Sequence, residues 1–119
     1  MKRYYQKCKN RLVYLGATAA PEYWDELWNK DLSSLKNLYK DHSYVSDITK
    51  SHIKGSGVIL EGGCGRANHV YALFKNGYKS IGIDYAENTI EFVNKYAPEL
   101  DVRLGDVRSL DIKSDSVDG

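Results

Sequence analysis

A short apolar run that leads into an acid and a glycine-rich turn is the feature that most constrains the fold. Residues 58–65 read VILEGGCG, with three glycines in the last four positions. Such a run predicts a buried strand, and the glycines allow the backbone angles that a sharp turn requires. Val70, Leu73 and Phe74 follow at helical spacing, and Gly77 ends that segment. The pattern therefore predicts a strand, a tight turn and a helix in succession.

The same alternation continues towards the end of the chain. KSIGID at 79–84 predicts a second strand, residues 87–96 a second helix, and residues 101–104 a third, weaker strand. Strands that alternate with helices form right-handed βαβ units around a parallel sheet, so the expected fold class is α/β. Residues 114–119 are typical of a loop that enters a fourth strand. We therefore expect an incomplete sheet in a part of a longer protein or a short natural product, with an open edge available for homo-oligomer formation.

The first half of the chain is expected to be helical. Trp24 and Trp28 lie one turn apart in a segment that begins at Pro21, a residue suited to a first helical turn. Leucines at helical spacing predict a second helix over 31–39, and a third is expected over 43–53. We therefore expect three helices before the first strand of the sheet.

These patterns divide the chain into two parts. Residues 1–57 are interpreted as an N-terminal helical cap segment, and residues 58–119 as a βαβαβ core. The sequence KGSG at 54–57 separates them, and we expect both parts to form one structural unit. The basic residues between 2 and 11 are interpreted as a solvated terminus rather than a binding patch.

Composition excludes several classes of partner. Seventeen basic and sixteen acidic residues nearly cancel, which indicates no nucleic-acid or membrane partner. The two cysteines, Cys8 and Cys64, match no disulfide framework or zinc spacing, so no metal is predicted and a reducing, cytoplasmic location is expected. The apolar part of residues 12–15 is too short for a signal peptide.

The charge at the glycine turn favours a cationic ligand. The dinucleotide fingerprint G-x-G-x-x-G fails because Asn68 stands where its last glycine belongs. A pyrophosphate over this turn would also meet Glu61, at a cost of about 4 kcal/mol for like charges about 4 Å apart near a protein surface. An ammonium group would be attracted on the same scale. S-adenosylmethionine carries an ammonium and a sulfonium and no phosphate.

The stretch LEGGCGRA closely resembles the first motif of class I S-adenosylmethionine-dependent methyltransferases. In this sequence Glu61 takes the motif's acidic place, Gly63 and Gly65 its first two glycines, and Ala67 its last, where the family often departs from glycine. The resemblance implies a Rossmann-like class I methyltransferase fold, here with strands 1–3 and the start of strand 4. It also implies that Glu61 and the backbone around Gly62 and Gly63 hold the methionine end of the cofactor.

Two later regions extend the resemblance. Asp84 ends the second predicted strand, where an acid can accept hydrogen bonds from both ribose hydroxyls of a nucleoside ligand. The stretch IGIDYAENTIEFVNK looks like the family's second region and places Tyr85 beside the adenine. LGDVRSL is similar to the third region, which implies that Asp106 accepts from the adenine amino group and that the Val107 backbone contacts the ring.

The helix before the core also resembles the family. YWDELW at 23–28 is similar to an aromatic helix that precedes the core in several methyltransferase families, in which two aromatic residues cover the cofactor. Trp24 and Trp28 take those places. Packing of both tryptophans between the cap and the sheet is the alternative.

The resemblance implies a methyltransferase that uses S-adenosylmethionine, releases S-adenosylhomocysteine, and methylates an unidentified acceptor. In the family the acceptor site is built largely after the fourth strand, so no catalytic residue is assigned and we expect the 119-residue chain alone to be inactive. A non-catalytic S-adenosylmethionine-binding module that needs a partner is the alternative. A nicotinamide or flavin domain is a third hypothesis.

Overall fold

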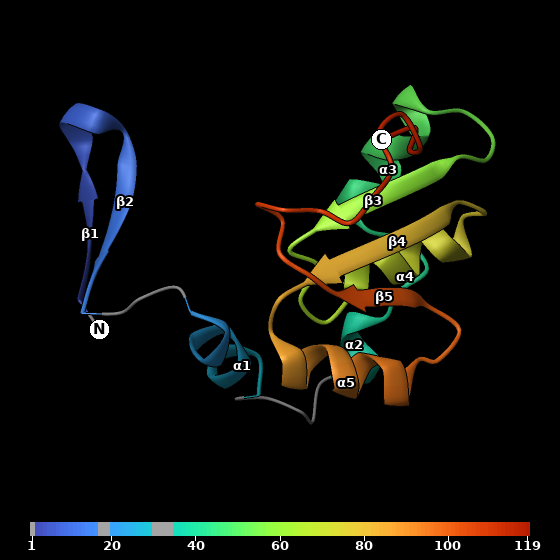
Figure 1. The fold of residues 1–119 in the computed structure, drawn as a ribbon. Helices are drawn as coiled ribbons and strands as arrows, with labels where there is room; N and C mark the ends of the chain where they lie inside the picture. Colours follow the sequence, from blue (N-terminus) through green and yellow to red (C-terminus); the bar gives the residue numbers. More distant parts are fainter. Residues whose placement is uncertain (1, 17–19, 30–34) are drawn as a thin grey trace.

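The computed structural model describes residues 2–16, 20–29 and 35–119, and the side chains of Tyr14, Trp28, Asn29, Leu35 and Lys36 lie outside that description. A parallel sheet with flanking helices forms the larger body, and an antiparallel hairpin stands apart from it at the N-terminus (Figure 1). In the described part of the chain no helix has the length and apolar character needed to cross a bilayer.

The parallel sheet contains β3 (Val58–Gly62), β4 (Lys79–Asp84) and β5 (Asp101–Leu104), in the order β3-β4-β5. Leu60 pairs with Ile81 between β3 and β4, and Ile83 pairs with Arg103 between β4 and β5. Parallel pairing of three successive strands confirms the predicted α/β fold. It also brings the carboxyl ends of all three strands to one edge of the sheet.

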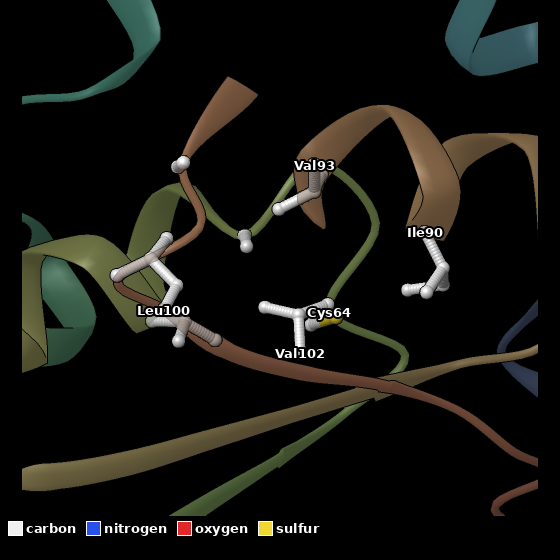
Figure 2. Packing of buried hydrophobic residues seen from close by; sticks show 8 residues of the cluster. Cys64, Ile90, Val93, Leu100 and Val102 are labelled. Carbon is white, nitrogen blue, oxygen red and sulfur yellow. The ribbon is translucent and has the colours of Figure 1, made fainter. Parts of the chain in front are cut away.

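Two helices connect these strands. α4 (Asn68–Lys75) follows β3, and α5 (Glu87–Tyr96) follows β4, close to the expected positions. Figure 2 shows Cys64, Ile90, Val93, Leu100 and Val102 packed between α5, the glycine turn and the sheet. This cluster fixes the turn against α5, so the loop at the end of β3 has a rigid support.

Close packing of the glycine turn over β4 requires Gly82. A Cβ at this position would lie 2.8 Å from the Cys64 sulfur and 2.9 Å from Cγ2 of Val70. Real Cβ atoms do not approach other atoms that closely. Gly82 therefore allows the turn and the first residues of α4 to rest directly on the middle strand.

Residues 2–15 of the segment interpreted as an N-terminal helical cap, residues 1–57, are not α-helical. Residues 2–15 form an antiparallel hairpin of β1 (Lys2–Gln6) and β2 (Arg11–Leu15), joined by the short 3₁₀ helix η1 (Lys7–Lys9). Asn10 completes the connection in the left-handed conformation, with φ of 47°, and its N–H donates to the Lys7 carbonyl. The helical prediction was wrong here because aromatic and β-branched residues face each other across the pair, as in Tyr4 opposite Val13.

The three expected helices of the first half are present, with changed bounds. They are α1 (Pro21–Asn29), α2 (Leu35–Leu38) and α3 (Tyr44–His52). Ser43 caps α3, because its hydroxyl accepts from the Ser46 N–H while the Ser46 hydroxyl accepts from the Ser43 N–H. α2 covers only part of the predicted 31–39 range, and residues 30–34 lie outside the described part.

After β5 the chain crosses the sheet and reaches the free edge of β3 (Figure 1). The Asp118 N–H donates to the Val58 carbonyl at 2.7 Å, and the Leu60 N–H donates to the Gly119 carbonyl at 2.8 Å. Residues 118 and 119 thus lie where the start of strand 4 was predicted and cover part of that edge. Homo-oligomer formation through the edge stays a prediction.

Candidate cofactor site

A cavity of about 400 Å³ lies at the carboxyl ends of the parallel strands. Its walls come from the glycine turn, the end of β4, the segment after β5, and α1. Six of the ten predicted site residues line it: Trp24, Gly63, Asp84, Tyr85, Asp106 and Val107. Gly105 and Arg108 complete the lining, and neither was predicted.

The glycine turn folds back onto the end of β4. Gly63 and Gly65 both have positive φ, 75° and 51°, which glycine adopts without a side-chain clash. The N–H groups of Gly63 and Cys64 donate to the Ile83 carbonyl at 2.7 and 3.1 Å. At Gly62 a Cβ would lie 3.0 Å from Cγ1 of Val107. Glycine at these positions therefore allows the turn to fold tightly against the end of β4 and against Val107.

Asp84 holds the turn as well as lining the cavity. Its side chain is buried, with Oδ2 accepting from the Gly65 N–H at 2.8 Å and Oδ1 accepting from the Ala86 N–H at 3.0 Å. Each carboxylate oxygen has a second lone pair, so both oxygens can still accept from a ligand. The carboxylate thus joins β3's turn to the start of α5 and presents negative charge to the cavity.

Glu61 lies beside the cavity rather than in its lining. Burial raises the pKa of Glu61 to about 7, a hydrogen bond from the Val70 backbone opposes this, and the negative charge of Asp84 raises the pKa further. Its Oε2 atom is buried and has no hydrogen-bond partner among the described residues. An unpartnered buried carboxylate oxygen next to a second carboxylate is an arrangement that a positively charged ligand group would satisfy.

The raised pKa of Glu61 makes the repulsion of a phosphate weaker than the sequence predicts. With a pKa of about 7, Glu61 is protonated in about half of the molecules at neutral pH. A phosphate would then meet a neutral carboxyl in those molecules, so the repulsion is weaker than a full like-charge pair. Discrimination between an ammonium and a phosphate is therefore expected to depend on pH.

Arg108 clamps Asp106 at the far side of the cavity. Its Nε donates to Oδ1 at 3.0 Å, its Nη2 donates to Oδ2 at 2.6 Å, and its backbone N–H donates to Oδ1 at 2.9 Å. These hydrogen bonds lower the pKa of Asp106 to about 2. The carboxylate is therefore ionised and fixed in orientation over the whole physiological range.

A family model described as a methyltransferase domain matches residues 60–119, half of the chain. The chain belongs to this methyltransferase family. The match begins within β3 and includes the glycine turn and the ends of β4 and β5. It confirms the resemblance to class I methyltransferases that the motifs carry.

Two solved structures share the fold of this methyltransferase domain. A Methanococcus maripaludis protein, provisionally assigned as an S-adenosyl-L-methionine-dependent methyltransferase, superposes with a TM-score of 0.63 and 13% identity, over 89% of this chain and 51% of that one. A Pyrococcus horikoshii OT3 protein superposes with a TM-score of 0.55 and 19% identity, over 73% of this chain and 45% of that one. The chain thus spans about half the length of either protein. No curated protein sequence matches it significantly.

Trp24 is the part of the cap that reaches the site. It lines the cavity of the methyltransferase domain from α1, and the Tyr23 ring contacts it edge-on at a centroid distance of 5.3 Å. Trp28 lies on the same helix, but its side chain is outside the described residues. The structure therefore places one of the two predicted aromatic residues at the cavity.

Cys64 and His69 lie near the glycine turn but outside the lining of the cavity. Burial, together with the charges of Asp84 and Glu61, raises the pKa of the Cys64 thiol to about 12, so the thiol is neutral and acts as a small packing group. His69 lies in the first turn of α4, and its buried Nδ1 has no hydrogen-bond partner among the described residues. Neither residue lines the cavity.

Proposed function

We propose that this chain is the cofactor-binding portion of an S-adenosylmethionine-dependent methyltransferase. The single observation that carries the proposal is a pair of neighbouring acids at the glycine turn: the buried Asp84, which lines the cavity, and the half-buried Glu61 beside it, whose buried Oε2 has no hydrogen-bond partner among the described residues. The cofactor supplies an activated sulfonium methyl group when it is bound. Family membership supports the same reaction class.

The methionine end of the cofactor would lie at the glycine turn. Glu61 would accept from its ammonium group, and the exposed backbone of Gly62 and Gly63 would approach it closely, since neither residue has a side chain. Gly65 would act through the turn, because its N–H is held by Asp84. Proton transfer from Glu61 to solvent accompanies binding in this arrangement, because the ammonium favours the ionised carboxyl.

The adenosine end would lie between the ends of β4 and β5. Asp84 would accept from the ribose hydroxyls, and Tyr85 would flank the adenine. Asp106 would accept from the adenine amino group by sharing with it a carboxylate whose two oxygens both accept from Arg108, and the Val107 backbone would contact the ring. Trp24 and Trp28 would cover the cofactor from α1. The acceptor of the methyl group stays open, and we assign no residue to the transfer step.

Calorimetry with S-adenosylhomocysteine tests the proposal. We expect binding that is weakened at least tenfold in both Glu61→Ala and Asp84→Ala, the scale of a lost charged hydrogen bond. Glu91→Ala, at an exposed position of α5, is the matched control and should bind like the unchanged chain. Absence of binding, or equal affinity in all variants, would overturn the proposal. Tighter binding of NAD than of S-adenosylhomocysteine would favour a nicotinamide domain instead.

A further inference from the structure

A buried carboxylate on the cap helix is bonded to the first turn of a core helix. Asp25 lies on α1, is only 8% exposed, and points to the N-terminus of α5. Its Oδ1 accepts from the Thr89 N–H at 3.1 Å and from the Thr89 hydroxyl at 3.2 Å. Its Oδ2 accepts from Nδ2 of Asn88 at 3.1 Å and from the Asn88 N–H at 3.5 Å. Both carboxylate oxygens are therefore used in one contact between distant parts of the chain.

α5 lacks a local cap that could supply these bonds. Its N-cap residue is Ala86, which makes no side-chain hydrogen bond to the first turn. The first N–H groups of a helix need an acceptor, and the helix dipole favours negative charge at this end. Asp25 provides both the acceptor oxygens and the negative charge, although it lies 63 residues before Asn88 and 64 before Thr89 in the sequence. Replacing the carboxylate with an amide would remove the charge and one of the two acceptor oxygens that the Asn88 and Thr89 donors share.

The position of this contact links the cap to the cavity. Asp84 and Tyr85, which line the cavity, stand directly before the α5 turn that Asp25 binds. Trp24 precedes Asp25 on α1 and lines the same cavity. Successive residues of a helix point about 100° apart, so α1 can direct Asp25 to α5 and Trp24 to the cavity. Asp25 itself does not line the cavity.

We propose that Asp25 is a positioning residue that fixes Trp24 as a wall of the cofactor cavity by fastening α1 to the first turn of α5. The inference rests on the proposed function for its ligand. It assigns a role to a residue that touches neither the cavity nor the ligand. Without the contact, Trp24 is in place in only a fraction of molecules, and the apparent association constant is multiplied by that fraction.

A double-mutant cycle separates positioning from general stability. We expect Asp25→Asn to weaken S-adenosylhomocysteine binding about tenfold, a usual coupling between residues in contact. In a Trp24→Ala background the same change should weaken binding less than about twofold, because the wall is already absent. A merely structural role predicts an equal loss in both backgrounds. Glu22→Ala, at an exposed position of the same helix, is the control and should leave affinity unchanged.

A second measurement needs no ligand. The chain has two tryptophans, so Trp24 is the only one in a Trp28→Phe background. Asp25→Asn in that background should shift the Trp24 emission to longer wavelength and increase acrylamide quenching. Failure of S-adenosylhomocysteine to bind the unchanged chain would count against the proposed function, and the emission would still test Asp25. Unchanged emission and quenching would overturn the positioning role.

A milder variant protects the test against unfolding. Thr89→Val removes only the hydroxyl donor and keeps the backbone N–H that Asp25 accepts from. It should weaken binding in the same direction as Asp25→Asn and by a smaller factor. If the Thr89→Val and Asp25→Asn variants both bound S-adenosylhomocysteine as tightly as the unchanged chain, this result would contradict the inference.

Discussion

Ionisation of Glu61 gives the proposed site a pH dependence that can be measured. Burial is the main cause that raises the pKa of this carboxyl to about 7. One pH unit below that pKa about one-tenth of the groups are ionised, and one unit above it about nine-tenths are. The dissociation constant for S-adenosylhomocysteine should therefore fall about tenfold between these two pH values, because only the ionised form attracts the ligand's ammonium.

Calorimetry across this range in two buffers of different ionisation enthalpy measures both the affinity and the protons released. Glu61→Gln has the same shape and no charge, so its affinity should stay weak and nearly independent of pH. Glu91→Gln, at an exposed position on α5, should retain the pH dependence of the unchanged chain. A flat affinity in the unchanged chain, or a slope that survives in Glu61→Gln, would refute the reasoning.

The same carboxyl predicts a change in stability without ligand. Because its pKa is raised in the folded state, the folded chain holds a proton that the unfolded chain releases between the usual pKa of glutamate and about 7. Stability is thus highest below this window and declines as pH rises through it. For a half-buried group the loss should be about 1–2 kcal/mol after solvent screening. Urea unfolding of Glu61→Gln should show that much higher stability above the window and equal stability below it.

Three further substitutions and one comparison variant, each followed by urea unfolding, test how the glycine turn is supported. Gly82→Ala should cost about 1–3 kcal/mol, because the new Cβ would lie 2.8 Å from the Cys64 sulfur; an unchanged midpoint would contradict this packing. Asp84→Asn places an amide group against backbone N–H donors and should cost about 1–3 kcal/mol as well as ligand affinity. Ala67→Gly should change stability by less than about 1 kcal/mol, since relief of its φ of 62° offsets a lost buried methyl. Ala72→Gly, in the interior of α4, has no such relief and should be the more destabilising of the two.

The core of the fold could be predicted from the sequence because its signals are local. Alternation between short apolar runs and helical spacing located β3, β4 and β5 and the helices between them. The N-terminal hairpin was missed because its strands are stabilised by each other, as in Tyr5 opposite Leu12. Its connection is a 3₁₀ turn closed by Asn10, which lacks the Asn-Gly or Asp-Gly signal of a tight hairpin.

The site residues also differ in how well the sequence predicts them. Asp84 could be predicted from the end of a strand, because strand ends of a parallel sheet meet at one edge. Tyr85 and Asp106 were predicted from the family resemblance of the segments that hold them. Arg108 was missed, although its spacing of two residues from Asp106 is a readable signal for a local ion pair. The contact of Asp25 with α5 gave no such signal. An acidic residue near the start of α1 is already explained by the dipole of that helix, whereas in the structure Asp25 accepts from the Thr89 N–H of α5.

Linkage between the cap and the ligand must act in both directions if Asp25 and Trp24 act as proposed. A contact that increases ligand affinity is itself stabilised by the ligand, and by the same factor. The Asn88 and Thr89 amides, which donate to Asp25, should therefore exchange hydrogen more slowly when S-adenosylhomocysteine is bound. The protection should reach about tenfold, the factor expected for Asp25→Asn, and should be lost in Trp24→Ala. Equal exchange rates with and without bound ligand would show that the cap and the cavity are independent.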